Sequence, residues 1–287
     1  MAKGRELKGR IKSVENTRKI TRTMEMVATS KMKRAQDRVV AARPYANALT
    51  EVISSLYSSE LAERFPLLRQ PGTPRRVALV VLTSNRGLAG GFNANLIKES
   101  RARLAEIEGR GAEVELHVVG RKGIGFFRYV GRAVATQRTD ITDRPTAADA
   151  ASLVDELMAR FIAGSLDAVY VIYAKFNSAL STPPTTLQVL PVRPPARGDG
   201  ATQRDYLLYP SAEEILTELL PSYVRNSVYR ALAETAAAEQ GARRTAMKSA
   251  TDNATELLNL YKRTYNRARQ AQITQEIAEI VGGAAAL

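Results

Sequence analysis

Apolar residues recur in alternating steps of four and three along the first fifth of the chain. The series runs from Leu7 to Leu56, and twelve of its fifteen members are apolar. A repeat of 3.5 residues is typical of the seam between two paired helices in a coiled coil. The pattern therefore predicts one long helix over residues 3–57.

The three polar members of this series follow one another. They are Arg18, Thr21 and Glu25. The apolar residues beside them are Ile20, Met24 and Val27. Such a shift predicts that the seam slips locally, as a stutter in a coiled coil would make it do. We therefore expect the large and polar side chains of this stretch to face outward.

A second long helix is predicted over residues 211–286. It begins with Ser211 followed by Glu214, the spacing of a capping box. Pro221 is expected to kink or interrupt it early, because proline lacks the amide hydrogen. No proline follows Val224. Small residues recur every fourth position and would let a partner helix approach closely: Ala242, Ala246, Ala250 and Ala254.

The lengths of the two helices predict an uncovered end. At 1.5 Å per residue the first is roughly 80 Å long and the second roughly 110 Å. If they pair antiparallel, the C-terminal end of the second helix extends beyond its partner. That end carries apolar residues at helical spacing: Ile273, Ile277, Ile280 and Ala284. It is too short to span a bilayer, so we expect another protein to cover it.

Strand and helix patterns alternate between the two long helices. Strands are predicted at 77–82, 114–119, 168–176 and 185–192, and helices at 93–108 and 147–162. This alternation indicates a Rossmann-like layer. The predicted fold class is α/β: a long antiparallel coiled coil of N- and C-terminal helices with an inserted Rossmann-like α/β domain. The predicted division is 1–58, 59–210 and 211–287.

The glycine-rich loop from Ser84 to Asn93 invites a nucleotide-binding interpretation but has the wrong spacing. It matches neither GxGxxG nor a phosphate loop ending in Gly-Lys-Ser/Thr. The single histidine, His117, lies in a strand pattern and is expected in the core. We find no motif for a catalytic set or a metal site, and we expect a chain without catalytic activity or cofactor. Because of the glycine-rich loop, a nucleotide-dependent α/β enzyme stays open as an alternative.

Charge and composition leave two classes of partner open. The net charge is +13, and residues 1–43 hold thirteen Lys or Arg against four acids. Such a surface suits an acidic protein or a nucleic acid. Aromatic residues are absent before Tyr45, so the stacking platforms of single-strand binders are missing. A basic coiled-coil nucleic-acid-binding protein stays open as the alternative. The chain has no cysteine and no pattern of a signal peptide.

Several motifs, in the same order, resemble the gamma subunit of the F-type ATP synthase along essentially the whole chain. One is the run from Ile20 to Met32, and another is Arg43-Pro44-Tyr45. The glycine-rich loop from Ser84 to Asn93 is a third. Near the C-terminus, the motifs are Ala250-Thr251-Asp252-Asn253 and the stretch from Ala268 to Glu276.

The resemblance implies a central-stalk rotor that turns inside a hexamer of alpha and beta subunits and couples proton translocation to ATP synthesis or hydrolysis. The implied partners are the alpha, beta and epsilon subunits and the membrane c-ring, with no nucleic acid. The catalytic sites would lie on beta. The implied location is peripheral, on the cytoplasmic face of the bacterial inner membrane.

The resemblance also implies roles for single residues. Arg22, Met24 and Glu25 match the part of the family that faces an acidic lever loop of beta. Three residues match contacts to the catch loops of the hexamer, namely Arg269, Gln270 and Thr274. Ile277 matches the apolar tip that turns in the bearing of the hexamer. Tyr206 matches a foot position near the c-ring, while Tyr209 stands where the family has an acidic residue.

Overall fold

The computed structural model describes residues 2–56, 64–70, 72–193 and 211–285. The chain separates into two compact units, one formed by residues 1–28 and 243–287 and the other by residues 29–242. Two long helices contribute to both units: α1 (Ala2–Leu56) and α6 (Ala212–Ala285). They confirm the two predicted helical arms.

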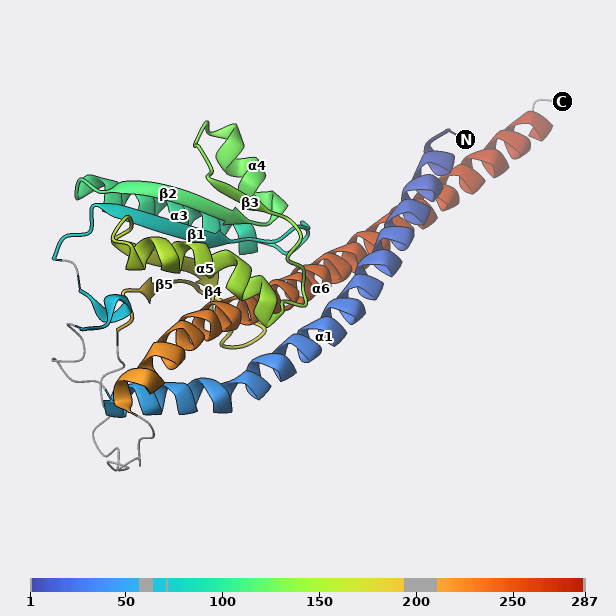
Figure 1. The fold of residues 1–287 in the computed structure, drawn as a ribbon. Coiled ribbons are helices and arrows are strands. Elements are labelled where there is room, and N and C mark those ends of the chain that lie inside the picture. Colours follow the sequence, from blue (N-terminus) through green and yellow to red (C-terminus); the bar gives the residue numbers. More distant parts are fainter. Residues whose placement is uncertain (1, 57–63, 71, 194–210, 286–287) are drawn as a thin grey trace. The chain divides into compact units, whose positions relative to one another are not determined.

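The second unit is built on a five-stranded sheet with the order β3-β2-β1-β4-β5 (Figure 1). Its strands are β1 (Arg76–Leu82), β2 (Glu113–Val119), β3 (Thr136–Arg138), β4 (Ala168–Ala174) and β5 (Pro184–Leu190). The first four are parallel, and β5 pairs antiparallel to β4. Parallel strands require crossovers, which here are the helices α3 (Phe92–Gly109), α4 (Arg121–Tyr129) and α5 (Ala147–Ile162). The predicted Rossmann-like layer is confirmed.

The two faces of the sheet bury different sets of side chains, because successive residues of a strand point to opposite faces. Leu79 and Val81 of β1 pack in the cluster that holds residues of α3 and α4. Val80 and Leu82 pack in the cluster that holds α5, the C-terminal end of α1 and the first turns of α6. The short 3-10 helix η1 (Pro66–Leu68) also contributes to this second cluster. Within the second unit, both long helices therefore share a core with the sheet.

Two elements of the sheet layer were absent from the sequence prediction, namely α4 and β3. The helix α4 contains Gly123 and Gly125, which lower its intrinsic helix propensity. Gly123 is required by packing, because a Cβ there would lie 2.7 Å from Thr83 Oγ1 and 2.8 Å from Val118 Cγ1. The strand β3 has only three residues, Thr136, Gln137 and Arg138, and all three are polar. Tertiary contacts, rather than local pattern, define both elements.

The expected interruption at Pro221 is wrong, because α6 continues through this residue. The helix is held on both sides of the proline by buried apolar residues. Leu216, Leu220, Val224 and Val228 are each 1% exposed or less and belong to the core cluster shared with α5. Their burial outweighs the loss of one backbone hydrogen bond at Pro221.

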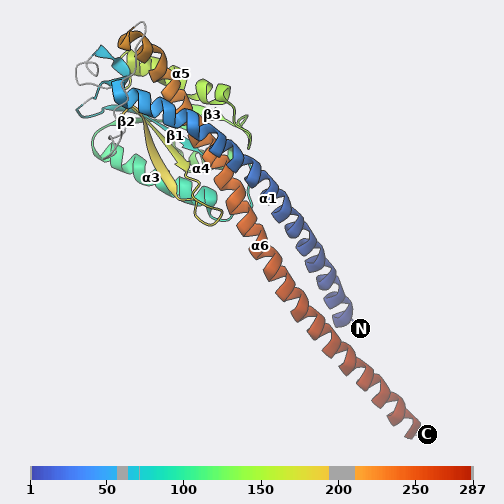
Figure 2. The ribbon, with the colours of Figure 1, turned by 90° about the horizontal axis from the view of Figure 1, so that it is seen from below.

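The first unit consists of residues 2–28 of α1 lying beside the C-terminal part of α6 (Figure 2). Its interior is lined from α6 by Met247, Ala254 and Leu258, which are all buried. Small and medium side chains at these positions allow the two helices to approach closely. Of the small residues predicted to face a partner helix, Ala254 is buried in this interior.

The predicted slip of the seam is wrong. Thr21 is buried at 8% exposure and Ala28 at 1%, whereas Ile20 is 60% and Val27 51% exposed. The 3.5-residue repeat therefore continues through its polar members. Ile20 and Val27 face outward, and Met24 is half-buried. The physical reason is that the Thr251 hydroxyl of α6 forms a hydrogen bond with the Thr21 hydroxyl, so burying Thr21 costs little.

Candidate interaction site

A hydrogen bond between α1 and α6 joins two buried threonines of the seam. Thr251 Oγ1 donates to Thr21 Oγ1 at 2.8 Å, and both residues are 8% exposed. The Thr21 hydroxyl also reaches its own helix, donating to the Arg18 carbonyl oxygen at 3.1 Å. A polar pair at one seam position favours one register of a coiled coil, because a shifted pairing would break the hydrogen bond between the two hydroxyls.

The predicted contact residues on α1 follow Thr21 within about one turn of the helix. Arg22 is exposed, while Met24 and Glu25 are half-buried at the edge of the seam. Only Arg22 is fully turned outward, so the structure does not present the three as one surface.

The outward surface of this stretch of α1 carries three large apolar side chains, whose exposure the sequence prediction missed. Ile20, Met26 and Val27 are 60%, 59% and 51% exposed. Ile20 and Val27 are seven residues apart, so they lie on the same face of the helix. The signal that could have found them is this spacing, since both lie one position before a seam residue.

The C-terminal end of α6 carries the second group of predicted contact residues. Arg269, Gln270 and Thr274 are exposed, and the Thr274 hydroxyl donates to the Gln270 carbonyl oxygen at 3.0 Å. Arg269 lies 18 residues beyond Thr251, which is about 27 Å along the helix. The two predicted groups are therefore separate along the first unit, and the structure does not bring them together.

Apolar side chains at this end of α6 are uncovered. Ile273 is 46%, Ile277 57% and Ile280 71% exposed, and Val281 follows at 63%. In Figures 1 and 2, α6 runs past the N-terminal end of α1 in the first unit. The predicted uncovered end is therefore present in the first unit, as an exposed apolar face on one helix.

The predicted foot position cannot be placed. Tyr206 lies outside the described residues, as does Tyr209.

The carboxyl edge of the sheet is where ligands bind in open α/β folds, but here the chain's own groups fill it. Thr83 Oγ1 donates to the Val119 carbonyl oxygen at 2.7 Å and accepts from the Gly123 amide at 3.0 Å. Gly120 (φ +97°) approaches so closely that a Cβ there would lie 2.2 Å from the Thr83 carbonyl oxygen. No room for a phosphate remains beside Thr83.

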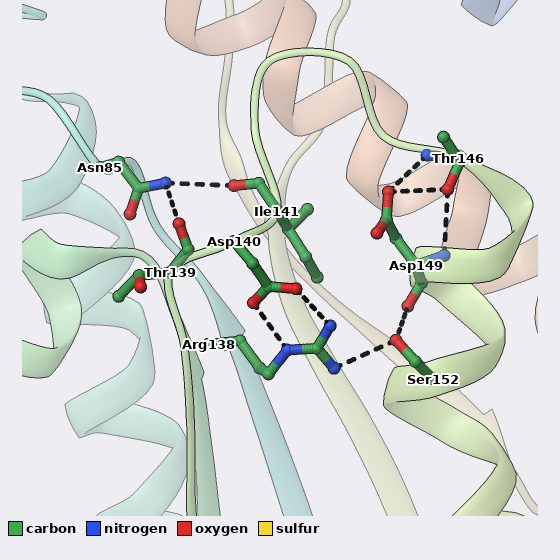
Figure 3. A network of polar contacts seen from close by, with 8 residues as sticks. All are labelled: Asn85, Arg138, Thr139, Asp140, Ile141, Thr146, Asp149 and Ser152. Atoms are coloured by element: carbon green, nitrogen blue, oxygen red, sulfur yellow. Dashed lines mark hydrogen bonds and ion pairs between the residues drawn. The ribbon is translucent and has the colours of Figure 1, made fainter.

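Side-chain hydrogen bonds also fix the loop that follows β1. Asn93 Oδ1 accepts from the Ser84 amide at 3.0 Å. Asn85 donates through Nδ2 to the carbonyl oxygens of Thr139 and Ile141 at 2.9 and 3.1 Å (Figure 3). The side chains of Asn85 and Asn93 thus tie the glycine-rich loop to the segments around it.

The helix α6 covers the carboxyl end of β4. Thr235 Oγ1 accepts from the Ala174 amide at 3.4 Å, and Glu234 Oε2 accepts from the Phe176 amide at 3.4 Å. Glu234 is 4% exposed, and its other oxygen accepts from Arg230 Nε at 2.9 Å. A buried carboxylate with two donors is a structural anchor for α6.

His117 is a core residue, as predicted. It is 8% exposed, and burial lowers the pKa of its imidazole while the nearby Glu115 carboxylate raises it. Glu115 itself accepts two hydrogen bonds from Arg160, at 3.0 and 2.7 Å, and these lower the pKa of its carboxyl group. The histidine therefore belongs to a packing cluster of β2 and α5.

Neither a metal site nor a membrane-spanning helix is found in the part of the chain that the structure describes. Within residues 2–56, 64–70, 72–193 and 211–285, no three His, Cys, Asp or Glu side chains lie close enough to hold a metal ion. No helix in these ranges is long and apolar enough to cross a membrane.

Comparison with known proteins gives full-length matches. The family model described as ATP synthase matches residues 3–287. The chain is 74% identical to the ATP synthase gamma chain of Gemmatimonas aurantiaca, with 100% of this chain and 99% of the relative covered. It is 45% identical to the gamma chain of Frankia casuarinae, with 99% and 97% covered.

Solved structures agree with these relatives. A chain in the central stalk and c-ring structure of the Tetrahymena thermophila mitochondrial ATP synthase has 27% identity and a TM-score of 0.62, with 80% of this chain and 99% of that chain covered. A chain of the Euglena gracilis mitochondrial ATP synthase has 22% identity and a TM-score of 0.71, with 99% and 94% covered. The latter shares the fold.

Proposed function

The chain belongs to the family of ATP synthase gamma chains and is a central-stalk rotor subunit, and we propose that its first unit turns inside a hexamer of alpha and beta subunits. Rotation of an asymmetric coiled coil would force the catalytic sites of the neighbours through different conformations. The chain itself would catalyse nothing. Family membership favours this function over the nucleic-acid alternative.

The observation that carries the proposal is the uncovered end of α6. From Ala271 to Val281 every side chain except the half-buried Gln272 is exposed, and four of the exposed ones are large and apolar. Full burial of one such side chain is worth about 1.5–3 kcal/mol, so four uncovered residues favour a covering partner strongly. An apolar sleeve formed by the hexamer would supply this cover while permitting rotation, since apolar contacts have no fixed direction.

Contacts to the surrounding subunits are assigned as follows. Arg22, Met24 and Glu25 would face the acidic lever loop of beta, with the exposed Ile20 and Val27 beside them. Arg269, Gln270 and Thr274 would contact the catch loops, and Ile277 would lie in the bearing. Tyr206 would be part of the foot that meets the c-ring.

The remaining partners and the location follow the same proposal. ATP synthases are membrane-associated, and the chain would lie peripherally on the cytoplasmic face of the bacterial inner membrane. The epsilon subunit and the c-ring would bind the part of the chain outside the hexamer. We propose the division into 1–58, 59–210 and 211–287 as the functional one, with the middle segment carrying these foot contacts.

The first test is Met24→Lys in the assembled complex. An added cation would meet the acidic loops of beta in a partly desolvated contact, where charge pairs exceed the roughly 0–1 kcal/mol of exposed pairs. We expect assembly to persist and proton pumping per ATP hydrolysed to fall in membrane vesicles. Met24→Leu is the matched control, because it keeps the volume without the charge. Unchanged pumping in Met24→Lys would count against this contact.

The second test is truncation after Gln272. Removing the uncovered end should lower torque or assembly, since the bearing surface is lost. Single-molecule rotation measures torque, and recovery of the hexamer with the chain measures assembly. Full wild-type behaviour of the truncated chain would exclude a bearing role.

A further inference from the structure

Two cations of α1 converge on one residue of the loop between β3 and α5. Lys31 Nζ lies 2.7 Å from Asp143 Oδ2, and Arg38 Nη2 donates to the Asp143 carbonyl oxygen at 2.9 Å. Lys31 and Arg38 are seven residues apart, which places them on the same face two turns apart. Asp143 is therefore held by its side chain and by its backbone at two separate points of the helix.

These contacts are partly shielded from water. The side chain of Lys31 is 38% exposed and that of Asp143 is 27% exposed. The other ion pairs of α1 that stay within the helix are far more open, for example Lys33 with Asp37, at 70% and 58%. Screening therefore weakens the Asp143 pair less than the ordinary pairs along the helix surface.

The loop that presents Asp143 is itself braced (Figure 3). Asn85 fixes Thr139 and Ile141 through their carbonyl oxygens, and Ile141 is buried at 6% exposure in the core shared with α5. Arg138 forms a bidentate pair with Asp140 and also donates to Ser152 Oγ at 3.1 Å. Because these hydrogen bonds fix the loop between β3 and α5, we expect it to deform little when a force acts on Asp143.

The loop is equally fixed where it enters α5. Thr146 and Asp149 form a capping box: the Asp149 amide donates to Thr146 Oγ1 at 3.2 Å, and the Thr146 amide donates to Asp149 Oδ2 at 2.8 Å. Asp143 thus sits between a strand end and a capped helix start, both of which belong to the sheet layer. A force on Asp143 reaches the sheet from both sides.

The helix α6 has its own directional tie to the same layer. Arg225 donates to both carboxylate oxygens of Asp155 in α5, at 2.7 and 3.0 Å. The free energy of apolar burial does not depend on direction, whereas that of a hydrogen-bonded ion pair does. Directional bonds are the contacts that oppose a twist of either helix against the sheet.

We propose that Lys31, Arg38 and Asp143 form a torque clamp, which holds α1 to the Rossmann-like layer and sets the torsional stiffness of the rotor at this point. The clamp residues are positioning residues, and the inference rests on the proposed rotor function. Loss of the clamp would leave assembly intact and make the connection between α1 and the layer more compliant.

The contact is tested by hydrogen exchange in the assembled complex. We expect Lys31→Met and Asp143→Asn each to speed exchange of the Arg144 and Thr146 amides by about two- to five-fold, the effect of losing one partly exposed ion pair. The double variant should exchange no faster than either single variant. Exchanging the charges, with Lys31→Asp and Asp143→Lys together, should restore protection. Lys33→Met is the matched control and should change nothing in this loop.

The mechanical role is tested by the angular fluctuations of a probe on the chain when rotation is stalled. We expect broader fluctuations in Lys31→Met and Asp143→Asn, wild-type width in the charge exchange, and wild-type width in Lys33→Met. Faster exchange with unchanged fluctuations would overturn the clamp, as would unchanged exchange. A wild-type complex that hydrolyses ATP without rotating would instead overturn the proposed function itself.

Discussion

Ile20→Ala distinguishes a continuous seam from a slipped one. In the structure 60% of Ile20 is exposed, so most of its side chain has no packing to lose. Burial of the remainder is worth below about 1 kcal/mol, and the higher helix propensity of alanine offsets about half of that. We expect the free energy of unfolding to fall by less than about 0.5 kcal/mol. A slipped seam, with Ile20 inside, would cost about 2–5 kcal/mol for the same change.

Leu258→Ala provides the matched comparison in the same unit. Leu258 is 3% exposed on the facing helix, so its truncation should cost about 2–4 kcal/mol. The assay is urea unfolding of the complete chain, followed by circular dichroism at the helix band, with the slope of the transition checked for each variant. Equal destabilisation by the two changes, or a larger effect of Ile20→Ala, would refute the continuous seam.

Three further predictions concern the interior. Thr251→Val should cost about 1 kcal/mol because Thr21 loses its donor, whereas Thr21→Val with Thr251→Val should recover most of it, measured as a double-mutant cycle in urea unfolding; additive costs would contradict the pairing. Burial lowers the pKa of His117 from 6.5, against the opposing effect of Glu115, so the folded chain binds fewer protons there than the unfolded chain. The free energy of unfolding should therefore fall as the pH drops below about 6.5, and His117→Gln should remove that part of the dependence in a pH series; an unaltered slope would disprove it. Gly123→Ala should destabilise the second unit by about 1–3 kcal/mol, because the added Cβ meets Thr83 and Val118, while Gly125→Ala, with open space at its Cβ, should be neutral or stabilising in the same unfolding assay.

Regular patterns made most of the fold predictable. The helix α5 was predicted with its observed bounds, because its apolar residues recur at regular helical spacing. The strands β1, β2, β4 and β5 were predicted with ends within two residues of those observed, and β1 was found as a short β-branched run between turn residues. The elements that escaped, α4 and β3, depend on contacts such as that of Gly123 with Thr83, which no local pattern contains.

The contact surface was predictable only in part. The uncovered isoleucines of α6 followed from helix lengths alone, since the longer helix must extend past the shorter one. The seam could not be judged in the same way, because whether Thr21 is tolerated inside depends on Thr251, which lies 230 residues away in the sequence. The clamp was equally hidden, since Lys31 and Asp143 are 112 residues apart and only the fold brings them together.

The most direct measurement is rotation of this chain within its native complex. The complex is purified gently, a probe is attached to the chain, and the probe is followed by single-molecule microscopy while ATP is hydrolysed. A central-stalk rotor predicts recovery with large nucleotide-binding subunits and stepwise rotation in one direction that stops when ATP is removed. Hydrolysis of ATP by the complex with a stationary probe, or recovery of the chain alone as a stable monomer, would contradict the account.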